Sequence, residues 1–146
     1  WTSSFFTEEG EHTELRRGIS RFQESLVEAF WYLEPGQLAA ADELAAELGA
    51  EVEALQAEGQ YQGRQLIGVD YRSFDRQSDT LAVVTVRERW KDTLHGFEGE
   101  WPTYGEPAIA ERGPYAVDLT YTVEETDSYG WQVTRVVFDG APPPWE

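Results

Sequence analysis

Hydrophobic residues fall on every second position near the end of the chain. From Tyr115 to Val123 one parity is apolar, and the other parity carries mostly polar side chains. A period of two is the pattern of a strand with one buried face. Residues 125–130 are polar and end in glycine, which predicts a turn, and a second alternating segment, Trp131–Phe138, follows. The pattern therefore predicts an antiparallel hairpin. Its expected core-facing row is Tyr115, Val117, Leu119, Tyr121, Val123, Trp131, Val133 and Val137.

The first third of the chain has helical spacing instead. Apolar residues in Glu11–Leu33 recur at steps of three and four, which predicts an amphipathic helix that ends before Pro35. Gln37–Glu58 repeats this spacing and predicts a second helix, with Gly49 as a possible break and Gly59 as the stop. The expected buried stripe of the first helix is Leu15, Ile19, Phe22, Leu26, Ala29, Phe30 and Leu33.

Two more strands are expected between the helices and the hairpin. Tyr61–Phe74 and Thr80–Trp90 are rich in β-branched and aromatic residues. The segment Leu94–Pro114 mixes glycine and proline with aromatic residues, and predicts a long irregular stretch of a functional or mobile kind. The order is therefore helix, helix and four strands. This order predicts an α+β fold in which helices pack on one face of an antiparallel sheet.

A length of 146 residues suits one domain with its own core. Residues 1–10 have no clear period and predict a linker or lead-in, residues 11–140 form the single domain, and residues 141–146 form a proline-rich tail. The chain has no methionine, so Trp1 is not expected to be a translation start. A removed signal peptide or anchor upstream would explain this. The location stays open, with an extracytoplasmic one favoured over a cytoplasmic one.

The charge and the residue types exclude several function classes. The net charge is −17, with 28 acidic against 11 basic residues, which argues against nucleic acid and against contact with anionic membranes. No run approaches the roughly 20 apolar residues that a membrane span needs. The chain has no cysteine, so it has no disulfide and no thiolate nucleophile. No metal-binding motif and no cofactor motif is found.

Part of the chain carries a pattern known from other proteins. The residues concerned are Leu33, Glu34, Pro35, Leu38, Leu48, Val52, Leu55, Gly59, Ile67, Val69, Val84 and Val86, followed by Tyr115-x-Val-x-Leu-x-Tyr and Trp131-x-Val. Between Phe30 and Phe138 the chain thus resembles the cone-shaped α+β folds of the nuclear-transport-factor-2-like superfamily. More narrowly, it resembles the IMS domain named from chloroplast-division proteins, which also occurs in bacterial proteins.

The resemblance implies N-terminal helices packed on a curved antiparallel sheet of about four strands, with a pocket between them. In IMS-type relatives this surface serves protein docking and not catalysis. In bacterial relatives the domain often lies outside the membrane behind a single anchor. The long segment before Tyr115, rich in glycine, proline and aromatic residues, departs from the plain pattern of the family.

Enzymes of this superfamily use a buried Asp, His or Tyr at the mouth of the cone, and two residues are weak candidates for that role here. Asp70 alternates with strand residues, so it could point into a pocket, where burial would raise its pKa and make it a proton acceptor. The alternative is a surface carboxylate that faces Arg87 or Arg89 on the next strand. His95 could be a base or a hydrogen-bonding residue of a loop.

A binding surface is expected from the aromatic residues and one arginine. Arg135 shares the parity of Trp131 and Val133, so it needs a partner or a water-filled cavity, unless the strand turns out of the core before it. The rings could meet near a cavity mouth, because aromatic and arginine residues are enriched in binding hot spots. They could equally cap the core. The candidate binding residues are Trp31, Tyr32, Trp90, Trp101, Tyr104 and Arg135.

The sequence leaves three hypotheses. The first is a non-enzymatic docking module with a protein partner, as the accessory domain of a larger anchored protein. The second is a small isomerase, cyclase or dehydratase that acts on a small apolar ligand in a pocket. The third is a homodimer that packs sheet against sheet through the face of Thr120 and Thr122.

Overall fold

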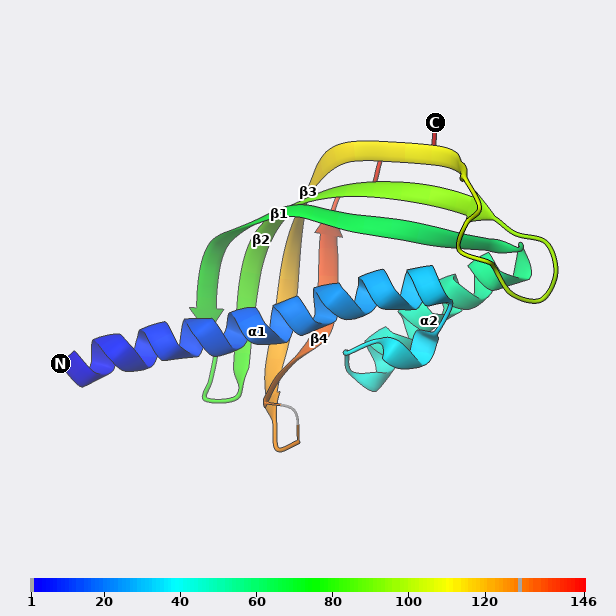
Figure 1. Ribbon diagram of the computed structural model, residues 1–146. Helices are drawn as coiled ribbons and strands as arrows, with labels where there is room; N and C mark the ends of the chain where they lie inside the picture. The colour runs from blue at the N-terminus through cyan, green and yellow to red at the C-terminus, as the bar shows by residue number, and fades with distance from the viewer. Residues whose placement is uncertain (1, 129) are drawn as a thin grey trace.

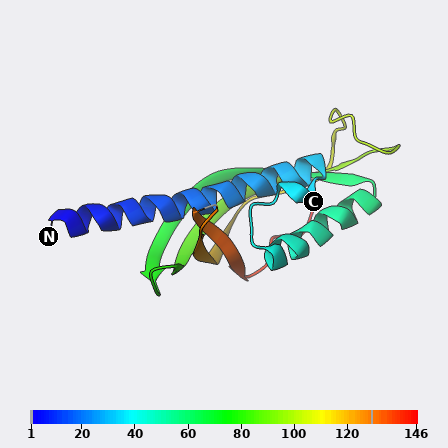
Figure 2. The same cartoon turned by 90° about the horizontal axis from the view of Figure 1, so that it is seen from below.

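The computed structural model describes the backbone of residues 2–128 and 130–146 and the side chains of residues 12–128 and 130–146. Two α-helices and a short 3-10 helix precede four strands. In Figure 1 the strands curve over α1, which crosses the concave side of the sheet. Seen from below in Figure 2, α1 and α2 lie on the same face of the strands. The prediction of an α+β fold with N-terminal helices on a curved antiparallel sheet is confirmed.

Helix α1 (Thr2–Tyr32) packs one stripe of side chains against the sheet. All seven residues of the predicted stripe are buried, so the helical spacing identified this face correctly. The predicted start at Glu11 was wrong, because the helix begins at Thr2. The apolar period shows where a helix buries its face, and it does not show where the backbone hydrogen bonds begin. The helix ends at Tyr32, and Leu33 after it has a left-handed φ of 57° and a buried side chain.

A short connection leads to α2 (Asp42–Ala57) through the 3-10 helix η1 (Pro35–Gln37). The second helix starts later than predicted, because residues 38–41 are extended and Ala41 N–H donates to the carbonyl of Val133 in the sheet (3.0 Å). Gly49 does not break α2. It is buried, and a Cβ there would lie 3.2 Å from Cβ of Pro35, so glycine lets the helix approach η1 closely. Gly59 follows the helix with φ 68°, as predicted for a stop.

The sheet consists of β1 (Gln60–Arg76), β2 (Leu81–Gly96), β3 (Ala108–Thr126) and β4 (Gly130–Asp139). All neighbours are antiparallel and the order is β1-β2-β3-β4. The register shifts at two places between β1 and β2, at two places between β2 and β3, and at one place between β3 and β4. Such bulges bend a strand and increase its twist, which accords with the curvature in Figure 1.

Residues 94–96 and 108–114 are strand, so the predicted irregular stretch Leu94–Pro114 was wrong over about half of its length. Strand β2 continues to Gly96 and β3 already begins at Ala108, so only residues 97–107 form a loop. Residues 108–112 pair with β2, and this pairing forms a strand although the segment around it contains glycine and proline. Gly113 and Pro114 lie at the bulge between the pairs Asp92/Arg112 and Trp90/Tyr115, where a proline removes no ladder hydrogen bond.

The hairpin of β3 and β4 is confirmed, but its second strand changes parity. Val123 pairs with Val133 and Thr122 pairs with Arg135, so Thr134 is an extra residue. After this bulge Val136 packs against the core, and Val137 is 47% exposed. The predicted inward orientation of Val137 was therefore wrong. Arg135 is exposed, which matches the alternative in which the strand leaves the core before it.

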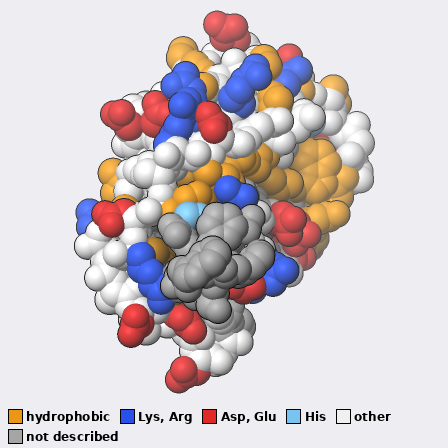
Figure 3. Space-filling model, turned by 90° about the vertical axis from the view of Figure 1, so that its left-hand side faces the viewer, with side chains coloured by type: hydrophobic (Ala, Val, Ile, Leu, Met, Phe, Trp, Pro, Cys, Tyr) orange, Lys and Arg blue, Asp and Glu red, His pale blue; other side chains and the backbone are white. Residues whose placement is uncertain are grey.

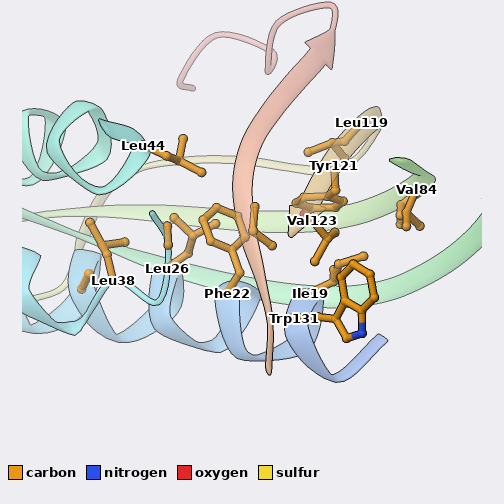
Figure 4. Packing of buried hydrophobic residues seen from close by; sticks show 14 of the residues in the cluster. Ile19, Phe22, Leu26, Leu38, Leu44, Val84, Leu119, Tyr121, Val123 and Trp131 are labelled. Carbon is orange, nitrogen blue, oxygen red and sulfur yellow. The ribbon is translucent and has the colours of Figure 1, made fainter. Parts of the chain in front are cut away.

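The core lies between α1 and the concave face of the sheet. Figure 4 shows side chains of α1, among them Phe22 and Leu26, meeting residues of β3 and β4. The rings of Phe22 and Tyr121 meet edge to face at 5.8 Å between centroids. Burial of each such side chain contributes about 1.5–3 kcal/mol. The two helices are therefore held to the sheet mainly by hydrophobic contact.

Figure 3 looks at the molecule from the end at which α1 begins. Acidic and basic side chains alternate over this face, with hydrophobic side chains between them, so its charge is mixed in spite of the net charge of −17. Within the part of the chain that the structure describes, no helix is both long enough and apolar enough to cross a membrane.

We expect Gly18→Ala to destabilise the fold, although alanine favours a helix more than glycine does. A Cβ on Gly18 would lie 2.5 Å from the carbonyl oxygen of Trp131, where backbone meets backbone and neither can move freely. Overpacking of this kind costs about 1–3 kcal/mol. Urea unfolding would measure the change. Gly36→Ala is the matched control, because a Cβ there meets nothing within 4 Å. An equal or higher stability of Gly18→Ala would contradict the close contact.

Candidate functional site

Five aromatic side chains from four parts of the chain meet where α1 ends. Trp31 and Tyr32 come from α1, Tyr61 from β1, His95 from β2 and Tyr104 from the loop of residues 97–107. We call these five residues the aromatic cluster. The rings of Tyr61 and His95 stack, with 4.8 Å between their centroids. The ring of Trp31 meets both edge-on, with centroid distances of 4.9 Å to Tyr61 and 5.4 Å to His95. The ring centroid of Tyr104 lies 5.6 Å from those of both Trp31 and Tyr32.

Glu106 fixes the loop against this cluster. Its carboxylate accepts hydrogen bonds from the Tyr61 hydroxyl (2.9 Å) and from the backbone N–H of Thr103 (3.1 Å). The carbonyl of Glu106 lies 2.8 Å from Nδ1 of His95, and Nε2 of the same ring lies 2.9 Å from the Thr93 hydroxyl. Loss of water around Glu106 acts to raise its pKa, but the hydrogen bonds from Thr103 and Tyr61 outweigh this and lower the pKa to about 2.

The phenol of Tyr61 belongs to the same arrangement. Burial disfavours the phenolate, and the hydrogen bond to Glu106 keeps the proton on the oxygen, so the pKa of Tyr61 rises to about 12. Tyr61 therefore acts as a neutral donor over the accessible pH range. The side chain is fully buried and forms the base of the aromatic cluster.

The outer part of the cluster is open to solvent. Tyr32 is 48% exposed, and Trp101, which lies in the same loop as Tyr104, is 58% exposed. Tyr104 has a φ of 66°, which is uncommon for a residue with a side chain and requires support from its surroundings. The ring contacts of Tyr104 and the hydrogen bonds of Glu106 supply that support.

The structure brings together three of the six predicted binding residues, Trp31, Tyr32 and Tyr104. Trp101 is three positions before Tyr104 in the same loop, and its ring makes no aromatic contact within the described residues. Trp90 lies elsewhere, 2% exposed in the interior. Arg135 lies beside a surface hollow that Glu43 and Glu47 of α2 also line. The sequence did not identify Tyr61, although it opens β1 directly after the Gly59 stop.

The two weak catalytic candidates lie in different surroundings. Asp70 is on the exposed side of β1, pairs across the strands with Arg87 and forms an ion pair with Arg72 at 3.3 Å. This arrangement matches the alternative given for Asp70, a surface carboxylate that faces an arginine on the next strand. His95 is half-buried in the aromatic cluster, and both ring nitrogens have hydrogen-bond partners. Neither residue lines the interior cavity described below.

The sequence pattern did not identify two buried carboxylates on β2. Glu88 is 1% exposed and Asp92 is fully buried. The available signal was their parity, because both share the inner row of Ala82, Val84, Val86 and Trp90. Glu88 accepts hydrogen bonds from Gln23 Nε2 (2.7 Å), from Trp90 Nε1 (2.7 Å) and from the hydroxyl of Tyr121. These donors come from α1, β2 and β3, and they satisfy the buried charge.

Asp92 holds two arginines. Its carboxylate accepts hydrogen bonds from Nε of Arg112 (2.7 Å), from Nε of Arg64 (3.4 Å) and from the Tyr115 hydroxyl (2.6 Å). The side chains of Arg64 and Arg112 are only 15% and 16% exposed. The guanidinium of Arg64 also lies over the ring of Trp90, 4.5 Å from its centroid. Strands β1, β2 and β3 thus fix both cations.

The two arginines line a cavity of about 400 Å³. Its walls come from α1, α2, the sheet and residues 140–142 of the tail. Most of the lining is apolar, with Glu47 and Glu51 of α2 as the acidic members. Burial raises the pKa of Glu51, while Arg64 and Arg112 act to lower it. Among the described residues, no group of three or more His, Asp or Glu side chains is placed to hold a metal ion.

Comparison with known proteins bears on the fold. No protein-family profile matches the chain, and no curated protein sequence matches it. Among solved structures, the intermembrane space region of the chloroplast protein ARC6 is similar, with a TM-score of 0.65 and 15% identity over 84% of this chain and 91% of that one. A periplasmic fragment of TraM has a TM-score of 0.52 and 14% identity over 86% and 98%.

A third similar structure is a nuclear transport factor 2-like superfamily protein from Salmonella enterica, with a TM-score of 0.49 and 13% identity over 99% of this chain and 95% of that one. The chain has the nuclear transport factor 2-like fold and resembles the IMS domain, as the sequence pattern predicted. At these identities the likeness concerns the path of the backbone and not the side chains of the site.

We expect acid to release the loop of residues 97–107. The pKa of Glu106 is lowered from 4.5 to about 2 in the folded protein. Its contribution to stability is therefore complete above pH 4.5 and is lost as the pH falls through about 2. NMR titration of the Glu106 carboxyl carbon should give a midpoint near pH 2. Tyr61→Phe should raise this midpoint, and Glu98→Gln in the same loop should leave it unchanged. A Glu106 midpoint near 4.5 in the unmodified protein would show that the anchor does not form.

Proposed function

We propose that this domain is a non-enzymatic docking module that binds a protein partner through the aromatic cluster and Trp101. It would serve as an accessory, extracytoplasmic domain of a larger anchored protein. The observation that carries the proposal is an exposed aromatic surface on a fixed base. Tyr32 and Trp101 are open to solvent, while Tyr61 at the base of the aromatic cluster is fully buried.

The energetics of binding favour such a surface. Exposed Trp and Tyr side chains bury a large apolar area on binding and lose little conformational entropy, so they dominate interface hot spots. The loop that carries Trp101 is held by Glu106 through Tyr61 and Thr103. A surface that is already ordered has less entropy to lose when a partner binds.

The chemistry of the candidate bases supports docking over catalysis. A general base must be able to reach the proton that it abstracts. Asp70 faces solvent beside Arg72, and both nitrogens of His95 are engaged by Thr93 and Glu106. Neither candidate lines the cavity, whose acidic members are Glu47 and Glu51 of α2 instead.

The similar structures support the proposed location. One is the intermembrane space region of a chloroplast protein, and another is a periplasmic fragment. Both are parts of larger proteins that lie outside an inner membrane. A domain with this fold in a comparable position is suited to contact a partner in that compartment.

We expect a photo-crosslinking amino acid at Trp101 to capture a discrete partner when the full-length protein is expressed in its own host. The matched control carries the same amino acid at Glu53, which is exposed on α2. Mass spectrometry of the crosslinked band would identify the partner. Capture of the same proteins from both positions, or of a second copy of this chain, would count against the proposal. The second copy would favour the homodimer.

We further expect Trp101→Ala to weaken the complex with that purified partner by about tenfold or more, the range of interface hot spots. Calorimetric titration would measure the affinity. The melting temperature should change little, because the side chain is 58% exposed and does not belong to the hydrophobic core. The proposal fails if Trp101→Ala lowers the melting temperature strongly while the affinity stays the same.

A further inference from the structure

The cavity between the helices and the sheet is partly open to solvent, and it has an arrangement that protein docking at the aromatic cluster does not explain. Its volume of about 400 Å³ lies within the range of roughly 300–1,000 Å³ of small-molecule sites. Side chains from both helices and the sheet make its apolar part, namely Phe22, Leu26, Phe30, Leu44, Leu48 and Val136. A cavity with this lining favours an occupant with a hydrocarbon body.

The other part of the cavity is positively charged and rigid. Arg64 and Arg112 each use Nε to bind Asp92. Within the described residues, Asp92 is the one carboxylate that forms an ion pair with either guanidinium. Two cations therefore share one ion-paired anion, so the group of Arg64, Arg112 and Asp92 carries one positive charge, which Glu47 and Glu51 of the same lining oppose. A guanidinium held through Nε can still present its terminal nitrogens to a carboxylate, which accepts hydrogen bonds from that edge.

Two acidic side chains limit the charge of the occupant. Glu47 and Glu51 of α2 line the same cavity. Partial loss of water raises the pKa of Glu51, but its side chain is exposed to solvent, so it still repels an anion. A head group with one negative charge matches the one positive charge of the group formed by Arg64, Arg112 and Asp92, and it meets the repulsion of both glutamates. A doubly charged phosphate would exceed that positive charge and would meet about twice the repulsion.

We propose that the cavity binds a small amphiphile of the fatty-acid class, with its single carboxylate at Arg64 and Arg112 and its hydrocarbon chain between α1 and α2. The volume suits a medium chain and not a whole phospholipid. The site uses none of the residues of the aromatic cluster, so it is independent of the proposed docking function.

The tail completes this site. Gly140, Ala141 and Pro142 line the cavity, and the ring of Trp145 lies 4.1 Å from the guanidinium carbon of Arg112. Two backbone hydrogen bonds of 2.8 and 2.9 Å join Glu146 to Glu111 on the edge of β3. The tail therefore forms a wall of the cavity and shields one face of Arg112 from water, which strengthens the attraction between Arg112 and a bound anion.

The test is calorimetric titration of the full chain with decanoate, below its critical micelle concentration. Decanol and decylamine have the same chain length and a neutral or cationic head. We expect saturable binding of decanoate that is at least about tenfold tighter than that of either control, the effect of a charge-assisted hydrogen bond. Equal binding of decanoate and decanol, or no saturable binding of decanoate, would overturn the proposal.

Variants separate the carboxylate site from a general apolar cavity. Arg112→Gln should weaken decanoate binding by about tenfold or more and leave decanol binding unchanged. Glu51→Gln should change decanoate binding in the opposite direction and tighten it, because it removes a competing anion. Arg89→Gln, on the exposed side of β2, is the matched control and should leave the binding of decanoate and of decanol unchanged.

If Arg112→Gln does not fold, Arg112→Lys is the second variant. It keeps the charge but removes the planar fork of the guanidinium, and it should still weaken decanoate binding. If none of these variants alters decanoate binding, the proposed carboxylate site is wrong.

One more comparison separates this proposal from the docking function. Trp101→Ala should bind decanoate as the unmodified chain does, and Arg112→Gln should still be crosslinked to the partner through position 101. Either function can then fail without the other.

Discussion

The burial of two carboxylates on the inner row of β2 is the constraint on which the other elements depend. A buried charge without partners costs several kcal/mol, so Glu88 and Asp92 are tolerated only where donors surround them. The donors to Glu88 come from α1, β2 and β3, and those to Asp92 come from β1 and β3. The position of α1 and the register of three strands must therefore be right at the same time. Apolar packing alone would tolerate small displacements of α1 along the sheet, but these directional hydrogen bonds do not.

The same row divides the concave face into regions with different properties. Around Glu88 the surface is filled by the apolar core, where Phe22 meets Tyr121. Around Asp92 two arginines open onto a cavity. At the end of α1 the face is closed by the aromatic cluster, with Tyr61 at its base. One curved sheet thus supports a packed centre, a charged cavity and an exposed aromatic surface. This division is why a docking function and a ligand site can be considered separately.

The likeness to the intermembrane space region of ARC6 extends over 84% of the chain at 15% identity. Burial periodicity can keep a fold at this level, because hydrophobic contact is not directional and tolerates exchange among apolar residues. Hydrogen-bonded groups such as Glu106 with Tyr61, or Asp92 with Arg112, tolerate no such exchange. The backbone can therefore be compared across these proteins, while the sites of this chain have to be argued from its own residues.

The sequence by itself determined the two helices, the stripe of α1, the Gly59 stop, the hairpin and the α+β class, because burial at a fixed period is a local property of the chain. It also indicated that five rings could meet, of which Trp31, Tyr32 and Tyr104 do and Trp90 and Trp101 do not. Only the tertiary structure decided the rest. The extra residue Thr134 reverses the parity of β4, so Val136 faces inward and Arg135 outward. Pairing with β2 turns the glycine- and proline-containing segment into strand. From the sequence, Glu88 and Asp92 look like ordinary alternating charges, because all their partners except Trp90 lie 20 to 65 positions away, as with Arg112 and Gln23. A charge is buried only when distant residues neutralise it, and no local pattern records that.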